Sequence, residues 1–111
     1  MKNDLFLNTT KIEIINNNQV IGSGTGFYFM LNVNDKKIPV LVTNKHVSQG
    51  GKKLKMFFHT DKGIKEYIVS SNEFINHYDE KIDLSILLIG NFMNELRNKN
   101  IFIKETVPNF V

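Results

Sequence analysis

The sequence predicts an all-β fold: a small six-stranded antiparallel barrel with a short helical or extended tail at its C-terminal end. Three observations favour this fold. Short segments rich in β-branched and aromatic residues recur along the chain, turn-forming residues separate them, and no helical periodicity precedes residue 91. A barrel is favoured over a sandwich because closure would remove the exposed strand edges. We expect one domain over residues 1–111, with the barrel at about 9–90 and a tail or linker at 91–111.

The first half of the chain predicts three strands. Residues 11–15 alternate polar and apolar side chains, and the asparagines at 16–18 tolerate the left-handed backbone of a hairpin turn. A returning strand follows, passes through a glycine-rich stretch and ends near Leu31. After a turn at Asn34, residues 37–43 form a third strand of β-branched and apolar residues. This last strand leads directly into the segment that carries the first candidate site residue.

The second half predicts one more hairpin and one more strand. The turn at 61–63 joins two strands of that hairpin, and the apolar run that ends at Gly90 suits a strand buried on both sides. The predicted elements after residue 43 are a helical turn that Thr43 or Asn44 could cap, strands at 54–59 and 64–69, a polar connection at 70–82, a strand at 83–89 and one or two helical turns at 91–100.

Length and composition limit the kinds of protein that this chain can be. A chain of 111 residues is long enough for one core but not for two barrels. Its 41% hydrophobic and 23% charged residues are typical of a globular domain and argue against wholesale disorder. The lack of cysteine favours a reducing interior, and the N-terminus has an apolar run too short for a signal peptide or a membrane span. We therefore expect a cytoplasmic protein that does not enter a membrane.

The net charge of +3 comes partly from lysines around the hairpin predicted at 54–69. Lysines on an exposed strand edge oppose aggregation, which is the simpler interpretation. An acidic or nucleic-acid partner is the alternative, because a basic patch attracts both. A nucleic-acid-binding barrel of the OB type would use Phe57, Phe58 and Tyr67 as stacking platforms, but these rings fit a core better. We expect no nucleic-acid partner.

Three segments in a fixed order carry the strongest functional signal. Gly22–Phe29 is rich in glycine, Thr43–Val47 places a histidine just past an apolar strand, and Lys81–Leu88 places an aspartate before another. Together they resemble the N-terminal half of the trypsin-like serine peptidases, which have the chymotrypsin fold. The resemblance covers roughly residues 10–90. It implies the first barrel of that fold.

The resemblance implies that His46 is a general base and that Asp83 is its orienting partner. A serine peptidase needs an imidazole held in one tautomer by a carboxylate, so that it can take the serine proton. Asp83 lies 37 residues after His46, so only the fold can bring the two together. Without the motifs, His46 would be a loop histidine bonded to backbone, and Asp83 would satisfy turn amides.

The family's nucleophile lies in a Gly-Asp-Ser-Gly-type turn of a second barrel, and this sequence has no such turn. The resemblance therefore implies half of a serine endopeptidase, inactive alone, which needs a C-terminal barrel to act on a peptide or protein substrate. Such a half should expose an apolar face and self-associate. The alternative is a non-catalytic protein-interaction module on the same barrel.

The remaining motifs predict neither a cofactor nor a metal. The glycines at 22–26 match no dinucleotide or phosphate loop, so we expect a close backbone approach or a bulge there. Ser23 is not in a nucleophile elbow. His59 and His77, taken with Asp61 and Asp79, match no zinc-binding spacing, and we expect His77 to pack or cap the loop before Asp83.

Overall fold

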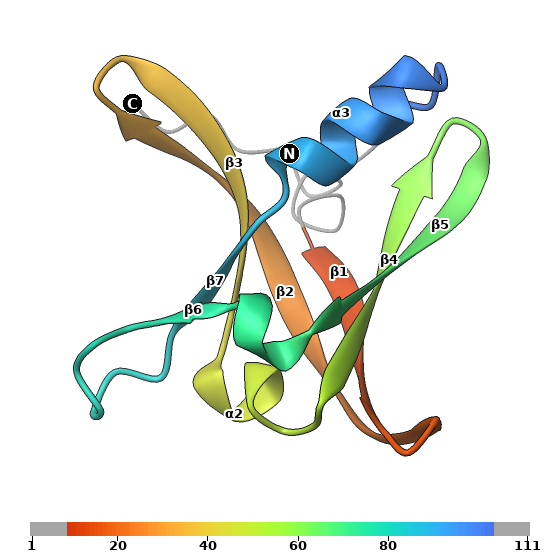
Figure 1. Cartoon of the computed structure of the whole chain (residues 1–111). Helices are drawn as coiled ribbons and strands as arrows, with labels where there is room; N and C mark the ends of the chain where they lie inside the picture. The colour runs from red at the N-terminus through yellow and green to blue at the C-terminus, as the bar shows by residue number, and fades with distance from the viewer. Residues whose placement is uncertain (1–8, 104–111) are drawn as a thin grey trace.

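A computed structural model describes residues 9–103 of the chain, and the protein is mostly β. The expectations for the N-terminus and for the end of the tail lie outside these residues. Seven strands form one antiparallel sheet in the order β5-β4-β1-β2-β3-β7-β6 (Figure 1). The strands are β1 (Thr9–Asn16), β2 (Gln19–Val33), β3 (Lys36–Thr43), β4 (Lys53–Thr60), β5 (Gly63–Ser70), β6 (Ile75–Asn76) and β7 (Ser85–Leu88). The helices are α2 (Lys45–Ser48), the 3-10 turn η1 (Ser71–Glu73) and α3 (Gly90–Asn98).

The antiparallel β fold and the helical segment after the last strand confirm the coarse prediction, but the closed six-stranded barrel is wrong. The sheet has seven strands and stays open, with β5 and β6 at its edges. These two strands are consecutive in the chain, and residues 71–74 connect them through η1. A capping box between Ser70 and Glu73 fixes this turn. The turn interrupts the ladder, and the short β6 then pairs with β7 instead of continuing β5.

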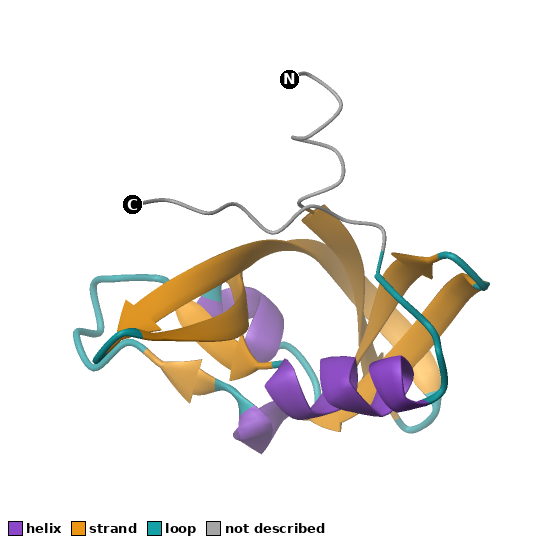
Figure 2. Cartoon of the chain, turned by 90° about the horizontal axis from the view of Figure 1, so that it is seen from above, coloured by secondary structure: helices purple, strands orange, loops and turns teal. Residues whose placement is uncertain are grey.

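The core lies on one face of the sheet, where α3 packs. Strict alternation puts Ile12 and Ile14 of β1 on this face, as well as Leu54, Met56 and Phe58 of β4. Phe92 of α3 completes the core through ring contacts: its centroid lies 4.9 Å from that of Phe58 and 4.1 Å from that of Tyr67. Figure 2 shows the strong curvature of the sheet, with α3 along one side. Phe58 is thus a core ring and Tyr67 packs against the core, as the sequence favours. The same expectation is wrong for Phe57, which is half-buried on the other face of β4.

The glycine-rich part of β2 allows close packing, which confirms that expectation. A Cβ atom on Gly24 would lie 2.6 Å from Cγ2 of Val47, and one on Gly26 would lie 2.9 Å from Cδ1 of Leu41. Val47 is buried and directly follows His46. Gly24 therefore lets the helical turn α2 sit against β2. No helix within residues 9–103 has the length and apolar character needed to cross a membrane.

Replacing Gly24 by alanine should destabilise the fold by about 1–3 kcal/mol, because the added methyl group overlaps Val47. Urea unfolding measures the loss. Gly22→Ala is the matched control on the same strand, since its Cβ would meet Ile14 at an ordinary 3.4 Å. Shortening Val47 to alanine in the Gly24→Ala chain should recover part of the loss. Equal losses for the two glycine variants would contradict this account of the close approach.

Candidate active site

Two neighbouring strands bring the predicted site residues together. Strand β3 pairs antiparallel with β7, and the last residue of β3, Thr43, lies opposite the first residue of β7, Ser85. His46 follows β3 within α2, and Asp83 precedes β7. A residue just past one strand and a residue just before its antiparallel neighbour lie at the same end of the sheet. The pairing of Thr43 with Ser85 therefore sets the spacing of the two candidate residues.

His46 and Asp83 are hydrogen-bonded, as the sequence analysis predicted. The distance from Nδ1 of His46 to Oδ2 of Asp83 is 2.6 Å. The backbone N–H of His46 also donates to Oδ1 of the same carboxylate, at 3.1 Å. One residue thus engages both carboxylate oxygens, which fixes the imidazole relative to Asp83. The catalytic roles of the two residues stay a prediction.

The charge state of Asp83 decides which nitrogen of His46 carries a proton. The hydrogen bond from the His46 ring is the largest effect on the pKa of Asp83 and lowers it below its ordinary value of 3.8. Desolvation opposes this shift, while the backbone N–H of His46, the charge of its ring and the backbone N–H of Lys45 each lower the pKa further. Asp83 is therefore ionised at neutral pH and can only accept hydrogen bonds. Nδ1 must be the donor, which leaves Nε2 of the neutral ring as an acceptor.

Two serines near the pair have structural roles. Ser48 and Ser85 are buried. Both hydroxyl groups donate to Oδ1 of Asn76, at 3.4 Å from Ser48 and at 2.8 Å from Ser85. Within residues 9–103, no serine or threonine hydroxyl is hydrogen-bonded to His46. The described part of the chain therefore presents a hydrogen-bonded imidazole and carboxylate, with no serine or threonine hydroxyl bonded to the imidazole.

The other histidines lie apart from the pair. Nδ1 of His77 accepts the backbone N–H of Asp79 at 3.0 Å, so His77 caps this loop as expected. His59 is exposed on β4. Asp61 accepts the backbone N–H of Phe102 at 2.9 Å. In the described part of the chain, no group of three or more histidine, aspartate or glutamate side chains is placed to hold a metal ion.

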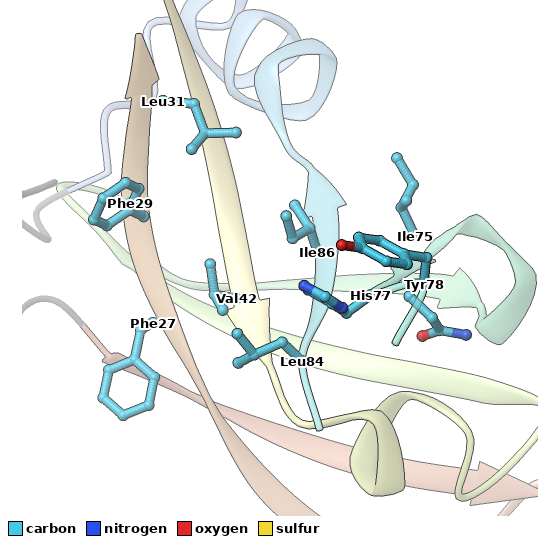
Figure 3. Close-up of a pocket in the computed structure, with 10 residues that line it drawn as sticks. Phe27, Phe29, Leu31, Val42, Ile75, His77, Tyr78, Leu84 and Ile86 are labelled. Carbon is cyan, nitrogen blue, oxygen red and sulfur yellow. The ribbon is translucent and has the colours of Figure 1, made fainter. Parts of the chain in front are cut away.

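An apolar hollow of about 640 Å³ lies on the outer face of the sheet. Phe27, Val42, Ile86 and Ile75 form one row across β2, β3, β7 and β6, because each is the register partner of the next. Leu84, which follows Asp83 directly, also lines the hollow. Figure 3 shows these side chains, with His77 and Tyr78 on the β6 side.

Sequence reasoning missed the hollow because it expected the strand after Asp83 to be buried on both sides. That expectation is wrong. Leu84 and Leu88 are 44% and 54% exposed, whereas Leu87, on the opposite face of β7, is buried. An apolar run shows that a strand has two apolar faces, but it carries no signal for whether a second layer covers the outer one.

Comparisons of the chain with models of protein families, with curated proteins and with solved structures found no match.

Replacing Asp83 by asparagine should reduce stability in a pH-dependent way. The folded chain holds the pKa of Asp83 below 3.8, so the ionised carboxylate stabilises the fold above that pH, and this contribution fades as the pH falls through the lowered pKa. The difference in free energy of unfolding between wild type and Asp83→Asn should therefore be larger at neutral pH than in acid. Urea unfolding over a pH series measures it.

The same substitution in a His46→Ala chain is the control, since the strongest cause of the lowered pKa is then gone. The pH dependence should shrink in that background. If the difference in free energy of unfolding between the wild-type chain and Asp83→Asn does not change with pH, the hydrogen bond is absent in solution.

Proposed function

We propose that this chain is the N-terminal half of a trypsin-like serine endopeptidase, in which His46 is the general base and Asp83 is its orienting partner. The hydrogen bond of 2.6 Å between Nδ1 of His46 and Oδ2 of Asp83 carries the proposal. It joins the residues that the family resemblance assigns to these roles, across 37 positions of sequence. It also leaves Nε2 as the acceptor, which is the state that a general base needs.

The proposed chemistry follows from that tautomer. Nε2 of His46 takes the proton of a serine hydroxyl while the serine oxygen attacks the carbonyl carbon of the scissile peptide bond. Asp83 stays ionised and stabilises the imidazolium that forms. The imidazolium then gives its proton to the leaving amine, and an acyl-enzyme remains. Water, activated by the same imidazole, hydrolyses the ester and regenerates the serine.

The serine, the oxyanion hole and the specificity pocket would come from a second barrel. We propose that the open sheet is the first half of the chymotrypsin-like fold and that its partner completes the site. Alone, the chain should be inert, because loss of the nucleophile costs about 10⁶-fold in subtilisin, which has the same triad on an unrelated fold, and loss of one oxyanion-hole donor costs about 10²–10³-fold.

The apolar hollow favours a second candidate function, a non-catalytic protein-interaction module. Several of its side chains are well exposed, among them Phe27 at 53% and Ile75 at 57%. A contiguous apolar surface of this kind marks interaction sites in soluble proteins. In that case the partner would be a protein with a complementary apolar surface, and the His46–Asp83 pair would have no chemical role. A second copy of the chain could use the same surface.

The catalytic proposal predicts that His46→Ala abolishes peptidase activity in the longest natural polypeptide that contains this segment. The loss of turnover should be about 10⁴- to 10⁶-fold, because the serine then has no base. Fluorogenic peptide hydrolysis and covalent labelling by a fluorophosphonate measure it. His59→Ala, at an exposed histidine of β4, is the control and should change turnover less than about twofold.

Two results would contradict the catalytic proposal. One is unchanged biological activity of the His46→Ala polypeptide, which would support the interaction module. The other is peptide cleavage by the purified 111-residue chain, because the missing nucleophile would then have been supplied from within it.

Self-association through the hollow should depend on its exposed apolar side chains. Phe27→Glu puts a charge into the hollow, so it should shift the 111-residue chain towards the monomer in sedimentation velocity. Ile68→Glu is the matched control, because Ile68 of β5 is 52% exposed but does not line the hollow. Equal effects of the two variants would show that the hollow is not the contact surface.

A further inference from the structure

The exposure of the His46–Asp83 pair raises the question of what holds it together. The side chains of His46 and Asp83 are 71% and 48% exposed. Exposed ion pairs contribute little, because water screens the charges and because fixing both side chains costs entropy. The loop that carries Asp83 spans residues 77–84 and includes no regular strand. Further contacts must therefore keep this loop beside α2 if the pair is to persist.

Asn44 supplies the first such contact. It occupies the N-cap position of α2, where an asparagine side chain usually accepts a hydrogen bond from the first turn. Here its side chain caps nothing. Its Nδ2 instead donates to the backbone carbonyl of Asp83, at 3.0 Å. The side chain of Asn44 thus makes no local cap bond and instead binds the backbone of Asp83, whose carboxylate accepts the hydrogen bond of the His46 ring.

Lys45 supplies the second contact. Its Nζ donates to the backbone carbonyl of Asp79, at 2.8 Å. That carbonyl also accepts the N–H of Ile82, at 3.0 Å, and the side chain of Asp79 accepts the N–H of Lys81, at 3.0 Å. The loop is therefore bonded within itself at the point that Lys45 reaches. A tether at Asp79 then restrains the few residues up to Asp83.

We propose that Asn44 and Lys45 are positioning residues, which clamp the loop carrying Asp83 to the turn carrying His46. With His46 itself, three successive residues bind one loop. The clamp lets this chain assemble the base and its carboxylate without help from another polypeptide. Its catalytic meaning rests on the proposed function, because a clamp matters for turnover only if His46 is the base.

Nuclear magnetic resonance on the labelled 111-residue chain tests the clamp directly. The amide N–H of His46 donates to the Asp83 carboxylate, so its hydrogen exchange reports whether the carboxylate stays in place. In the double variant Asn44→Ala, Lys45→Met, this amide should exchange at least about threefold faster, the effect of losing one modest hydrogen bond. The pKa of Asp83, read from its carboxyl carbon, should rise towards 3.8.

The single variant Asn44→Ala distinguishes loss of the positioning contact from loss of the Lys45 charge. It removes no charge, yet it should still raise the pKa of Asp83. The amides of Val47 and Ser48 are internal controls, since both bond to the carbonyl of Asn44 within α2. Their exchange should not change. Lys81→Met is the matched control for loss of a lysine, because only the backbone N–H of Lys81 bonds within the loop.

Two results would overturn the clamp. One is an unchanged His46 amide and Asp83 pKa in the double variant. The other is faster exchange of His46, Val47 and Ser48 together, which would mean that the two side chains only stabilise the helical turn. Neither result bears on whether a peptidase exists, and a missing peptidase activity would leave the clamp intact, so the two proposals fail separately.

Discussion

The hydrogen bond between Nδ1 of His46 and the Asp83 carboxylate is the interaction on which the catalytic proposal depends. It exists because β3 and β7 are neighbours in register, with Thr43 opposite Ser85. A slip of one residue would turn every side chain of β7 to the other face and would displace Asp83, which precedes β7, relative to His46. The chemistry at the rim of the sheet is thus a consequence of strand pairing deeper in the fold.

The two faces of the sheet hold that pairing in different ways. On the inner face, Tyr28, Leu41 and Leu87 lie in one buried row across β2, β3 and β7. On the outer face, the corresponding row through Val42 and Ile86 borders an apolar hollow. The buried row on the inner face holds β3 and β7 together, so that His46 and Asp83 meet at their ends. The outer face is an apolar surface for which the described residues provide no cover, which agrees with both proposed functions.

Local sequence patterns predicted the structural features that depend on residues close together in the chain. The glycines at 22–26 indicated a close approach or a bulge, and the structure has the closest approach at Gly24. The meeting of His46 with Asp83 was implied by the family resemblance, because no local pattern links residues 37 positions apart. The open sheet was missed because β6 has only two residues, and so short a strand leaves no periodic signal. The rule for helix caps left Thr43 and Asn44 open, and Asn44 takes the cap position. The expected side-chain cap bond is absent, because the Asn44 side chain donates to the backbone carbonyl of Asp83 instead.

The most direct test of the central claim is the nitrogen-15 spectrum of the His46 imidazole in the 111-residue chain, at a pH where the ring is neutral. The account predicts that Nδ1 carries the proton and Nε2 does not, since an ionised Asp83 can only accept. It also predicts that Asp83→Ala shifts this population towards protonated Nε2. A wild-type ring protonated mainly at Nε2, unchanged by loss of Asp83, would contradict the account.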